Sequence, residues 1–221
     1  MNLNLFSIFD PSTSMNLSLN WISMIIMFLL FPIQFWLIPS RYQMFINLIF
    51  NTLLKEFKML INFSFSNFIM FFSLFFTITL NNFMGLFPYI FTSSSHLSFC
   101  LSLSLSLWLS MILFSIFNYL NDFLSHLTPQ GTPFLLMPFM VIIESISLII
   151  RPVTLSIRLT ANMIAGHLLL SLLGSTSQSM NNFFMIMIIP TQLLLFMLEL
   201  SVSIIQAYVF TILTTLYSNE V

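Results

Sequence analysis

The sequence predicts an all-α integral membrane protein with about five membrane-crossing helices and one amphipathic helix in the membrane interface. Charged residues make up 5% of the chain and hydrophobic residues 58%, whereas soluble domains carry roughly a quarter charged residues. So few charges cannot cover a soluble protein of 221 residues with a polar shell. The apolar residues form long runs, and the last two runs are longer than a single crossing needs.

The charge balance and the cysteine count exclude several classes of protein. A net charge of −1 leaves no basic surface for nucleic acid. A single cysteine, Cys100, excludes a disulfide within the chain and a cysteine-based metal cluster. We therefore expect no cofactor and no metal site.

One membrane domain is expected over residues 1–221, beginning with a crossing and an interfacial helix. Residues 1–40 hold an N-terminal segment and a first apolar run over about 21–38. In residues 41–62, polar side chains recur three or four positions apart, which predicts an amphipathic helix along the interface. The polar positions are Asn47, Asn51, Lys55, Lys58 and Asn62. With Arg41, this helix holds three of the five basic residues, so the positive-inside tendency puts it on the matrix or cytoplasmic side.

Residues 66–120 are expected to form the second and third crossings, over about 66–91 and 97–120. In the third, Leu and Ser alternate strictly from Leu101 to Leu107, and period two alone would suggest a strand. An isolated strand cannot cross hydrocarbon because its backbone groups would lie unpaired. We therefore predict a helix whose Ser hydroxyls bond carbonyls one turn back.

Residues 134–217 are expected to form a long helical hairpin. Its arms are apolar runs over 134–173 and about 183–217, with a polar turn between them. About forty helical residues extend for ~60 Å, twice the ~30 Å thickness of the hydrocarbon. The arms must therefore tilt strongly or break, and Pro152 and Pro190 are the positions where a bend is expected.

The order of the crossings predicts the topology. Because the basic interfacial segment is inside, the N-terminus is expected outside. Five crossings then leave the C-terminus inside, with loop 121–133 inside and turn 174–182 outside.

Each arm of the hairpin carries a stripe of polar and charged residues. Positions seven apart on a helix point within ~20° of one another. The first stripe comprises Glu144, Ser147, Arg151, Thr154, Arg158 and Asn162. The second comprises Gln192, Glu199, Ser203 and Gln206. Lipid would not tolerate either stripe, so both are expected to face protein or water. Ala161 and Ala165 beside the first stripe would let another helix approach closely.

Two interpretations of these charges are open: buried pairs that only fix the helix register, and a path for ions. Arginine stays protonated in proteins, so Arg158 can act only as a fixed positive charge. His167, Glu199 and Glu144 can exchange protons. We favour the second interpretation, because a gated proton path needs a fixed cation flanked by titratable groups.

The positions of the titratable groups along the hairpin predict two half-paths. His167 lies nine residues after Arg158, about 180° around the helix from it, and nearer the outer turn. Glu199 is in the outer half of its arm, whereas Glu144 is nearer the inner loop. Titratable groups thus lie on either side of Arg158 in depth, which suggests two separate aqueous routes.

Several motifs resemble subunit a of the F-type ATP synthase, in its mitochondrial branch. IRLTANMIAGH, residues 157–167, resembles the arginine motif of that family, and LELSVSIIQAYVFTILTTLY, residues 198–217, resembles its last helix. HLTPQGTP, NNFMGLFPY and NLFSIFDPST resemble the mitochondrial members. The resemblance covers most of the chain.

The resemblance implies a stator subunit of the mitochondrial inner membrane that is not itself catalytic and that translocates protons beside a rotating ring of c subunits. The last two helices would form a strongly tilted hairpin against that ring. The implied partners are the c-ring, the peripheral stalk, other small membrane-sector subunits and the lipid bilayer.

The resemblance also implies roles for single residues. Arg158 would face a carboxylate of the ring, with Gln206 close to it. His167 and Glu199 would line the half-channel from the intermembrane space, and Glu144 would lie on the matrix-side path. The implied proton path comprises His167, Glu199, Glu144, Asn162, Ser203 and Arg151. A turn at about residue 178 would place Glu199 opposite Ile157, whereas the family pairs Glu199 with His167.

Three other classes of protein are alternatives to this one. A secondary antiporter or a proton-pumping respiratory subunit also uses intramembrane charges, but usually shows repeats or broken helices. A b-type haem protein needs paired histidines, and His96 and His126 lie near segment ends, where an interfacial position is expected. A pure assembly scaffold would not need the polar stripes.

Overall fold

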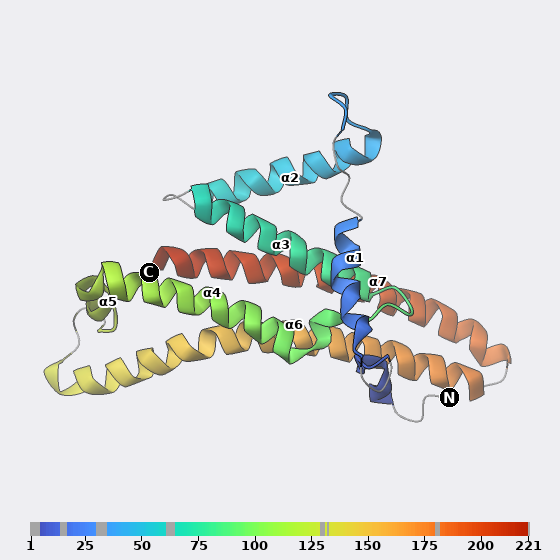
Figure 1. Cartoon of the computed structure of the whole chain (residues 1–221). Helices are drawn as coiled ribbons and strands as arrows, with labels where there is room; N and C mark the ends of the chain where they lie inside the picture. Colours follow the sequence, from blue (N-terminus) through green and yellow to red (C-terminus); the bar gives the residue numbers. More distant parts are fainter. Residues whose placement is uncertain are drawn as a thin grey trace.

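The computed structural model describes residues 5–13, 17–29, 35–60, 65–128, 131, 133–179 and 182–220. Within them the regular elements are seven α-helices and four short 3₁₀ segments, which confirms the all-helical class. Three of these helices are long and apolar enough to cross a membrane, over Leu97–Asn118, Phe134–Ser177 and Met185–Ser218. A shorter apolar stretch, Ile69–Gly85, lies beside them. Figure 1 shows the long helices running roughly alongside one another.

The N-terminal part consists of short helices. The segments η1 (Leu5–Phe9) and η2 (Leu19–Ile22) precede α1 (Ser23–Leu29). The first predicted crossing, over 21–38, therefore begins as a helix, but residues 30–34 of it lie outside the described residues. That crossing stays a prediction.

The interfacial helix is α2, Arg41–Leu60. Its predicted polar positions up to Lys58 are exposed, and Asn62 lies outside the described residues. On its other face Phe57 is 1% exposed, and the ring of Phe50 lies 4.4 Å from that of Phe76, between centroids. Apolar packing of one face against α3 (Phe65–Gly85) explains the helical spacing of its polar residues.

The helix α3 ends at Gly85, earlier than the predicted residue 91. Turns follow, with Tyr89 at a φ of 69°, because Pro88 disfavours a helical residue before it. The short segment η3 (Ser93–Ser95) then leads into α4 (Leu97–Asn118). The Leu/Ser repeat is helical as predicted, and the Ser102 hydroxyl donates to the Phe99 carbonyl at 2.8 Å. The predicted loop after α4 contains one further helix, α5 (Leu120–His126).

After η4 (Phe134–Leu136), the hairpin consists of α6 (Met137–Ser179) and α7 (Asn182–Glu220). These helices have 43 and 39 residues, so α6 is about 65 Å long at ~1.5 Å per residue. Neither breaks at its internal proline. Both instead curve along their length (Figure 1), so the arms bend rather than break.

The apolar core is shared by α3, α4, α6 and α7. Its buried members are Leu74, Phe75, Ile78, Cys100, Leu107, Leu155, Leu159, Ala207 and Phe210. Buried hydroxyl groups among these residues bond carbonyls of their own helix. The Thr211 hydroxyl, for example, donates to the Ala207 carbonyl at 3.1 Å. Small residues at these positions let the helices approach closely. This core fixes the hairpin against α3 and α4.

Candidate functional site

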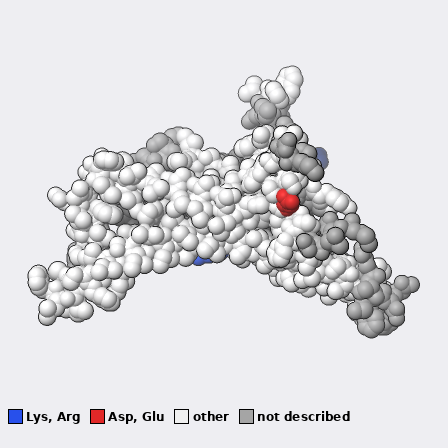
Figure 2. All heavy atoms as spheres, turned by 60° about the horizontal axis from the view of Figure 1, so that its bottom comes forward, with Lys and Arg blue, Asp and Glu red and all other residues white. Residues whose placement is uncertain are grey.

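Arg158 lies on an exposed, otherwise apolar face of α6. Its neighbour Ile157 is 47% exposed, and Ala161 and Ala165 are exposed as well. Figure 2 brings forward the side that lies at the bottom of Figure 1, where α6 runs, and shows little charge on it. In the described part of the chain, Arg158 forms no ion pair and no hydrogen bond from its guanidinium. Its charge is therefore not neutralised by these residues.

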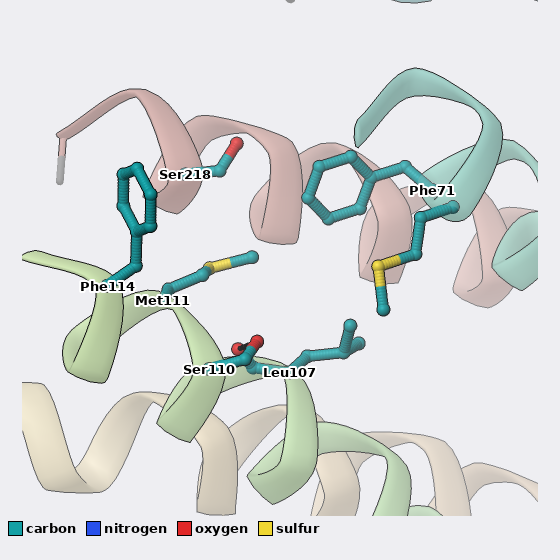
Figure 3. Close-up of a pocket in the computed structure, with 7 residues that line it drawn as sticks. Phe71, Leu107, Ser110, Met111, Phe114 and Ser218 are labelled. Carbon is teal, nitrogen blue, oxygen red and sulfur yellow. Dashed lines mark hydrogen bonds between the residues drawn. The ribbon is translucent and has the colours of Figure 1, made fainter. Parts of the chain in front are cut away.

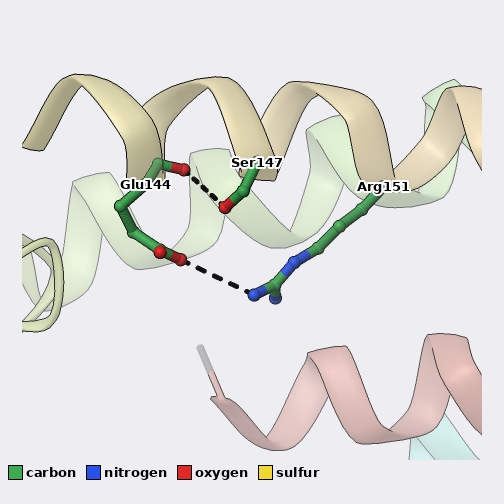
Figure 4. A network of polar contacts seen from close by, with 3 residues as sticks. All are labelled: Glu144, Ser147 and Arg151. Atoms are coloured by element: carbon green, nitrogen blue, oxygen red, sulfur yellow. Dashed lines mark hydrogen bonds and ion pairs between the residues drawn. The ribbon is translucent and has the colours of Figure 1, made fainter. Parts of the chain in front are cut away.

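Arg151, seven residues earlier, has partners within the chain. Its Nη2 lies 3.6 Å from Glu144 Oε1, and its Cζ lies 4.9 Å from the centre of the Tyr217 ring. Figure 4 shows the guanidinium reaching back along α6 toward Glu144, whose carbonyl accepts a bond from the Ser147 hydroxyl at 2.8 Å. The first stripe therefore divides: its beginning is held against the end of α7, whereas Arg158 is exposed.

His167 and Glu199 lie together in a cavity of about 190 Å³ between α6 and α7. Asn162 and Leu86 also line it. The cavity thus joins the second half of α6, the outer half of α7 and the turn after α3. Asn162 and Ala165, four and seven residues after Arg158, line it together with His167, so the cavity borders the face of α6 that carries Arg158.

The register of the hairpin brings Gly166, next to His167, against Glu199. A Cβ atom built on Gly166 would lie 2.6 Å from Glu199 Oε1. The alternative that placed Glu199 opposite Ile157 is therefore wrong. The polar linker 174–182 is not a symmetric turn, because α6 continues through it to Ser179.

The two titratable groups in this cavity have buried atoms without hydrogen-bond partners. Glu199 is 7% exposed, and within the described residues neither of its carboxylate oxygens has a hydrogen-bond partner; the same holds for Nε2 of the half-buried His167. Buried polar groups of this kind normally bond water when protein offers nothing. The cavity has room for water beside them.

The N-terminal segment also reaches this site. The ring of Phe9 meets the imidazole of His167 edge-on, with 6.4 Å between centroids. The next residue, Asp10, accepts a bond from the Ser12 backbone N–H at 3.0 Å, which holds the pKa of that exposed carboxyl below its usual value. A carboxylate therefore belongs to the residue directly after the one that contacts His167.

Two other predicted site residues lie further along α7. Ser203 is 1% exposed; its hydroxyl donates to the Leu200 carbonyl at 2.7 Å, and its own carbonyl accepts from Asn82 Nδ2 at 3.4 Å. Gln206 is half-buried, and among the described residues no hydrogen bond joins it to Arg158. Arg158 and Gln206 thus flank the cavity residues rather than belong to the cavity.

Sequence reasoning missed two features of the site: Gly166 and the amides of α3. Gly166 leaves the space that the Glu199 carboxylate occupies, and Asn82 is fully buried against α7. The sequence signal for the Gly166 contact was a glycine directly before His167. The signal for the buried amides was a pair of consecutive asparagines near the end of an apolar run.

A second cavity lies at the other end of the helices and carries no candidate chemistry. It has about 240 Å³ between α3, α4 and the end of α7, and Figure 3 shows its mainly apolar walls. The hydroxyls of Ser110 and Ser218 on its wall donate to carbonyls of their own helices. Among the described residues, no group of three or more His, Cys, Asp and Glu side chains is placed to hold a metal ion.

Comparisons with known proteins give a consistent result. A family described as "ATP synthase A chain" matches residues 17–219. The chain is 56% identical to ATP synthase subunit a of Drosophila yakuba over 223 residues, covering all of both chains. It is 56% identical to that of Anopheles quadrimaculatus over 225 residues and 55% identical to that of Drosophila melanogaster over 223, again over full lengths.

Proposed function

We propose a mechanism from one premise: the chain belongs to the ATP synthase A chain family, as the proton-translocating subunit a of the Fo sector. As such it is a multi-pass membrane protein with partners in that sector. Within this frame, the chain is a stator with two aqueous half-channels. These load and unload protons on carboxylates of a rotating c-ring and so couple proton flow to ATP synthesis.

The proposed setting is the mitochondrial inner membrane, with the N-terminus in the intermembrane space and the C-terminus in the matrix. The exposed basic residues of α2 support this orientation through the positive-inside tendency. The c-ring would cover the apolar face of α6, and the peripheral stalk, other small subunits and lipid would cover the remaining surface. The end of the molecule that carries the 174–182 turn is called the outer end.

The observation that carries the proposal is the exposure of Arg158. A charge on a lipid-facing surface costs at least ~2.5–3.5 kcal/mol, and no ion pair within the described residues offsets it. A carboxylate from a neighbouring subunit would remove this cost. Ala161 and Ala165 beside Arg158 allow such a neighbour to approach closely.

On the outer side, a proton would pass through the His167–Glu199 cavity to a ring carboxylate. Once neutral, that carboxyl group can face lipid at low cost, whereas the ionised form cannot. Rotation then carries it away from the cavity. Within the described residues the Glu199 oxygens have no hydrogen-bond partner, which supports this role, because they remain available to accept a proton.

On the inner side, the returning carboxyl group would lose its proton toward Glu144. Arg158 favours that loss, because it attracts the ionised carboxylate, and it repels any proton that would cross directly between the routes. Gln206, Asn162 and Ser203 would complete the polar lining. The driving energy is about 2.3 kcal/mol per proton for each 100 mV of membrane potential, plus the pH term.

The test is Arg158→Ala in the assembled complex. Proton-driven ATP synthesis should be lost, and after removal of the soluble head the membrane sector should leak protons passively. Arg151→Ala is the matched control, since it removes an arginine from the same helix whose partners lie within the chain. That variant should not leak.

A second experiment tests the outer route. Glu199→Gln combined with His167→Ala should slow proton uptake from the outer side. ATP synthesis by the Arg158→Ala variant would contradict the role of Arg158. Unchanged flux through the double variant at every pH would contradict the roles of Glu199 and His167.

A further inference from the structure

A layer of buried polar residues lies at the outer end of α3 and in the segment after it. We call it the outer polar layer; it comprises the half-buried His96 and six buried residues, Asn81, Asn82, Thr92, Ser93, Ser94 and Ser95. Asn82 is fully buried and Ser94 is 1% exposed. Short polar segments usually lie at the surface, so the burial of η3 between α3, α4 and α6 calls for an explanation.

Contacts join this layer to the Glu199 cavity. Asn82 Nδ2 donates to the Ser203 carbonyl at 3.4 Å, and Ser203 lies one helical turn beyond Glu199 on α7. The neighbouring Asn81 accepts a bond from the Ser93 hydroxyl at 3.3 Å. Polar groups therefore lie at intervals between Glu199 and η3, with the end of α3 between them.

The buried unpartnered polar atoms in the described residues belong either to the outer polar layer or to the Glu199 cavity. Buried side-chain atoms without a hydrogen bond belong only to Asn82, Ser94, His96, His167 and Glu199 within the part of the chain that the structure describes. Unpaired buried polar groups are unfavourable unless water satisfies them. Their grouping in one region points to a row of water molecules rather than to unrelated defects in packing.

His96 occupies the end of the layer that is furthest along the chain from Asn82. Its ring lies 5.3 Å from that of Trp21 and 5.1 Å from that of Phe91, between centroids. The side chain is half-buried, yet its Nε2 is buried and unpartnered. The imidazole thus reaches both the surface and the interior, and the Ser23 hydroxyl braces this arrangement by donating to the Phe91 carbonyl at 3.2 Å.

We propose that protons reach Glu199 from the outer side through His96 and a file of water held by the outer polar layer. The neutral imidazole accepts a proton on its free nitrogen and releases the proton of the other nitrogen to the next water, so no net charge stays behind. Serine and asparagine side chains do not titrate in this range and only orient the water. The inference rests on the proposed role of Glu199 and adds an entrance to it.

The test compares His96→Phe with His96→Gln in the intact complex. Passive proton flux is measured in sealed vesicles after the soluble head is stripped off. Phenylalanine keeps the ring packing with Trp21 and Phe91 but cannot bond water, whereas glutamine loses the ring and keeps hydrogen-bonding atoms. A proton relay predicts about a hundredfold loss for His96→Phe, at the lower end of the range that a positioned acid–base group supplies, and a smaller loss for His96→Gln.

A packing role predicts the reverse order, and that order would overturn the proposal. Ser94→Ala gives a second measurement that does not alter the aromatic contacts: it should slow flux severalfold. Ser106→Ala, at an exposed position of α4, should not. If His96→Phe does not assemble, the Ser94 and Ser106 pair decides the question.

Glu199→Gln, measured in the same vesicles, separates this inference from the proposed function. Slow flux in Glu199→Gln with normal flux in His96→Phe and Ser94→Ala would refute the entrance and leave the role of Glu199 intact. Normal flux in all three would refute both.

Discussion

Gly166→Ala adds one methyl group at the point where α6 meets Glu199. The new Cβ would lie 2.6 Å from Glu199 Oε1, 2.8 Å from Cδ and 3.0 Å from Cγ. Favourable contacts begin at roughly 3.5 Å, so the carboxylate must retreat by about 1 Å. The helix itself loses nothing, since alanine is about 1 kcal/mol better than glycine in a helix interior.

The expected effect therefore falls on proton transfer. Overpacking of a filled site costs ~1–3 kcal/mol, and a misplacement of ~1 Å in a reacting group can cost about 100-fold in rate. We expect passive proton flux through the stripped membrane sector to fall by about tenfold or more. The assembled complex should be recovered in normal amounts.

Gly174→Ala is the matched control, because a Cβ at that position of the same helix meets no atom within 4 Å. It should leave flux unchanged. Glu199→Asp should partly restore flux in the Gly166→Ala background, since the shorter side chain withdraws from the added methyl. Full flux in Gly166→Ala alone would show that Glu199 does not transfer protons from its position against Gly166.

Two further predictions concern contacts that hold α7 in place. Tyr217→Leu removes the ring beneath Arg151. A cation–π contact of this kind contributes ~0.5–2 kcal/mol, so the complex should unfold at a lower temperature in a thermal scan. Tyr217→Phe keeps a ring and should not differ from the parent. Tyr208→Phe removes the hydrogen bond from Tyr208 Oη to Glu56 Oε2 at 2.9 Å and should destabilise the protein by no more than about 1.5 kcal/mol. An equal loss in a Glu56→Ala variant, which has no side-chain acceptor, with no further loss in the double variant, would assign that effect to the bond; additive losses would contradict it.

The helices could be predicted from sequence because each depends on one local pattern. The Leu/Ser repeat of α4 has a strand period, yet the requirement for internally paired backbone groups in hydrocarbon overrides it. The hydroxyl of Ser106 accordingly donates to the Leu103 carbonyl at 3.0 Å. The end of α3 was misplaced because the apolar run continues past Gly85, where Pro88 and the next turn end the helix.

The register of the hairpin could not be predicted in the same way. It depends on how two curved helices pack over their whole length, and a shift of one turn changes every facing pair. A symmetric turn at about residue 178 was the simplest assumption, but the polar residues after Leu173 continue α6 to Ser179 instead. Polarity marks a turn in sequence, whereas helical hydrogen bonds decide where it forms.

The outer polar layer shows a related limit. The run from Thr92 to His96 has the composition of an exposed loop, yet four of its residues are at most 5% exposed. Its burial depends on contact between η3 (Ser93–Ser95) and α6, a helix that begins only at Met137. Composition alone gives no sign of such a contact.

The two arginines of α6 show how one stripe serves two purposes. Arg151 and Arg158 lie seven residues apart on one helix, so the sequence predicts that their side chains point in the same direction to within ~20°. Their surroundings differ: Tyr217 at the end of α7 covers Arg151, and Glu144 on α6 offsets its charge. Beyond that point α7 leaves Arg158 uncovered, and its own acid, Glu199, faces Gly166 inside the hairpin. An arginine paired within its chain has no free charge with which to attract a passing carboxylate, so the proposed exchange of protons with a neighbouring subunit is assigned to Arg158, which forms no ion pair within the described residues.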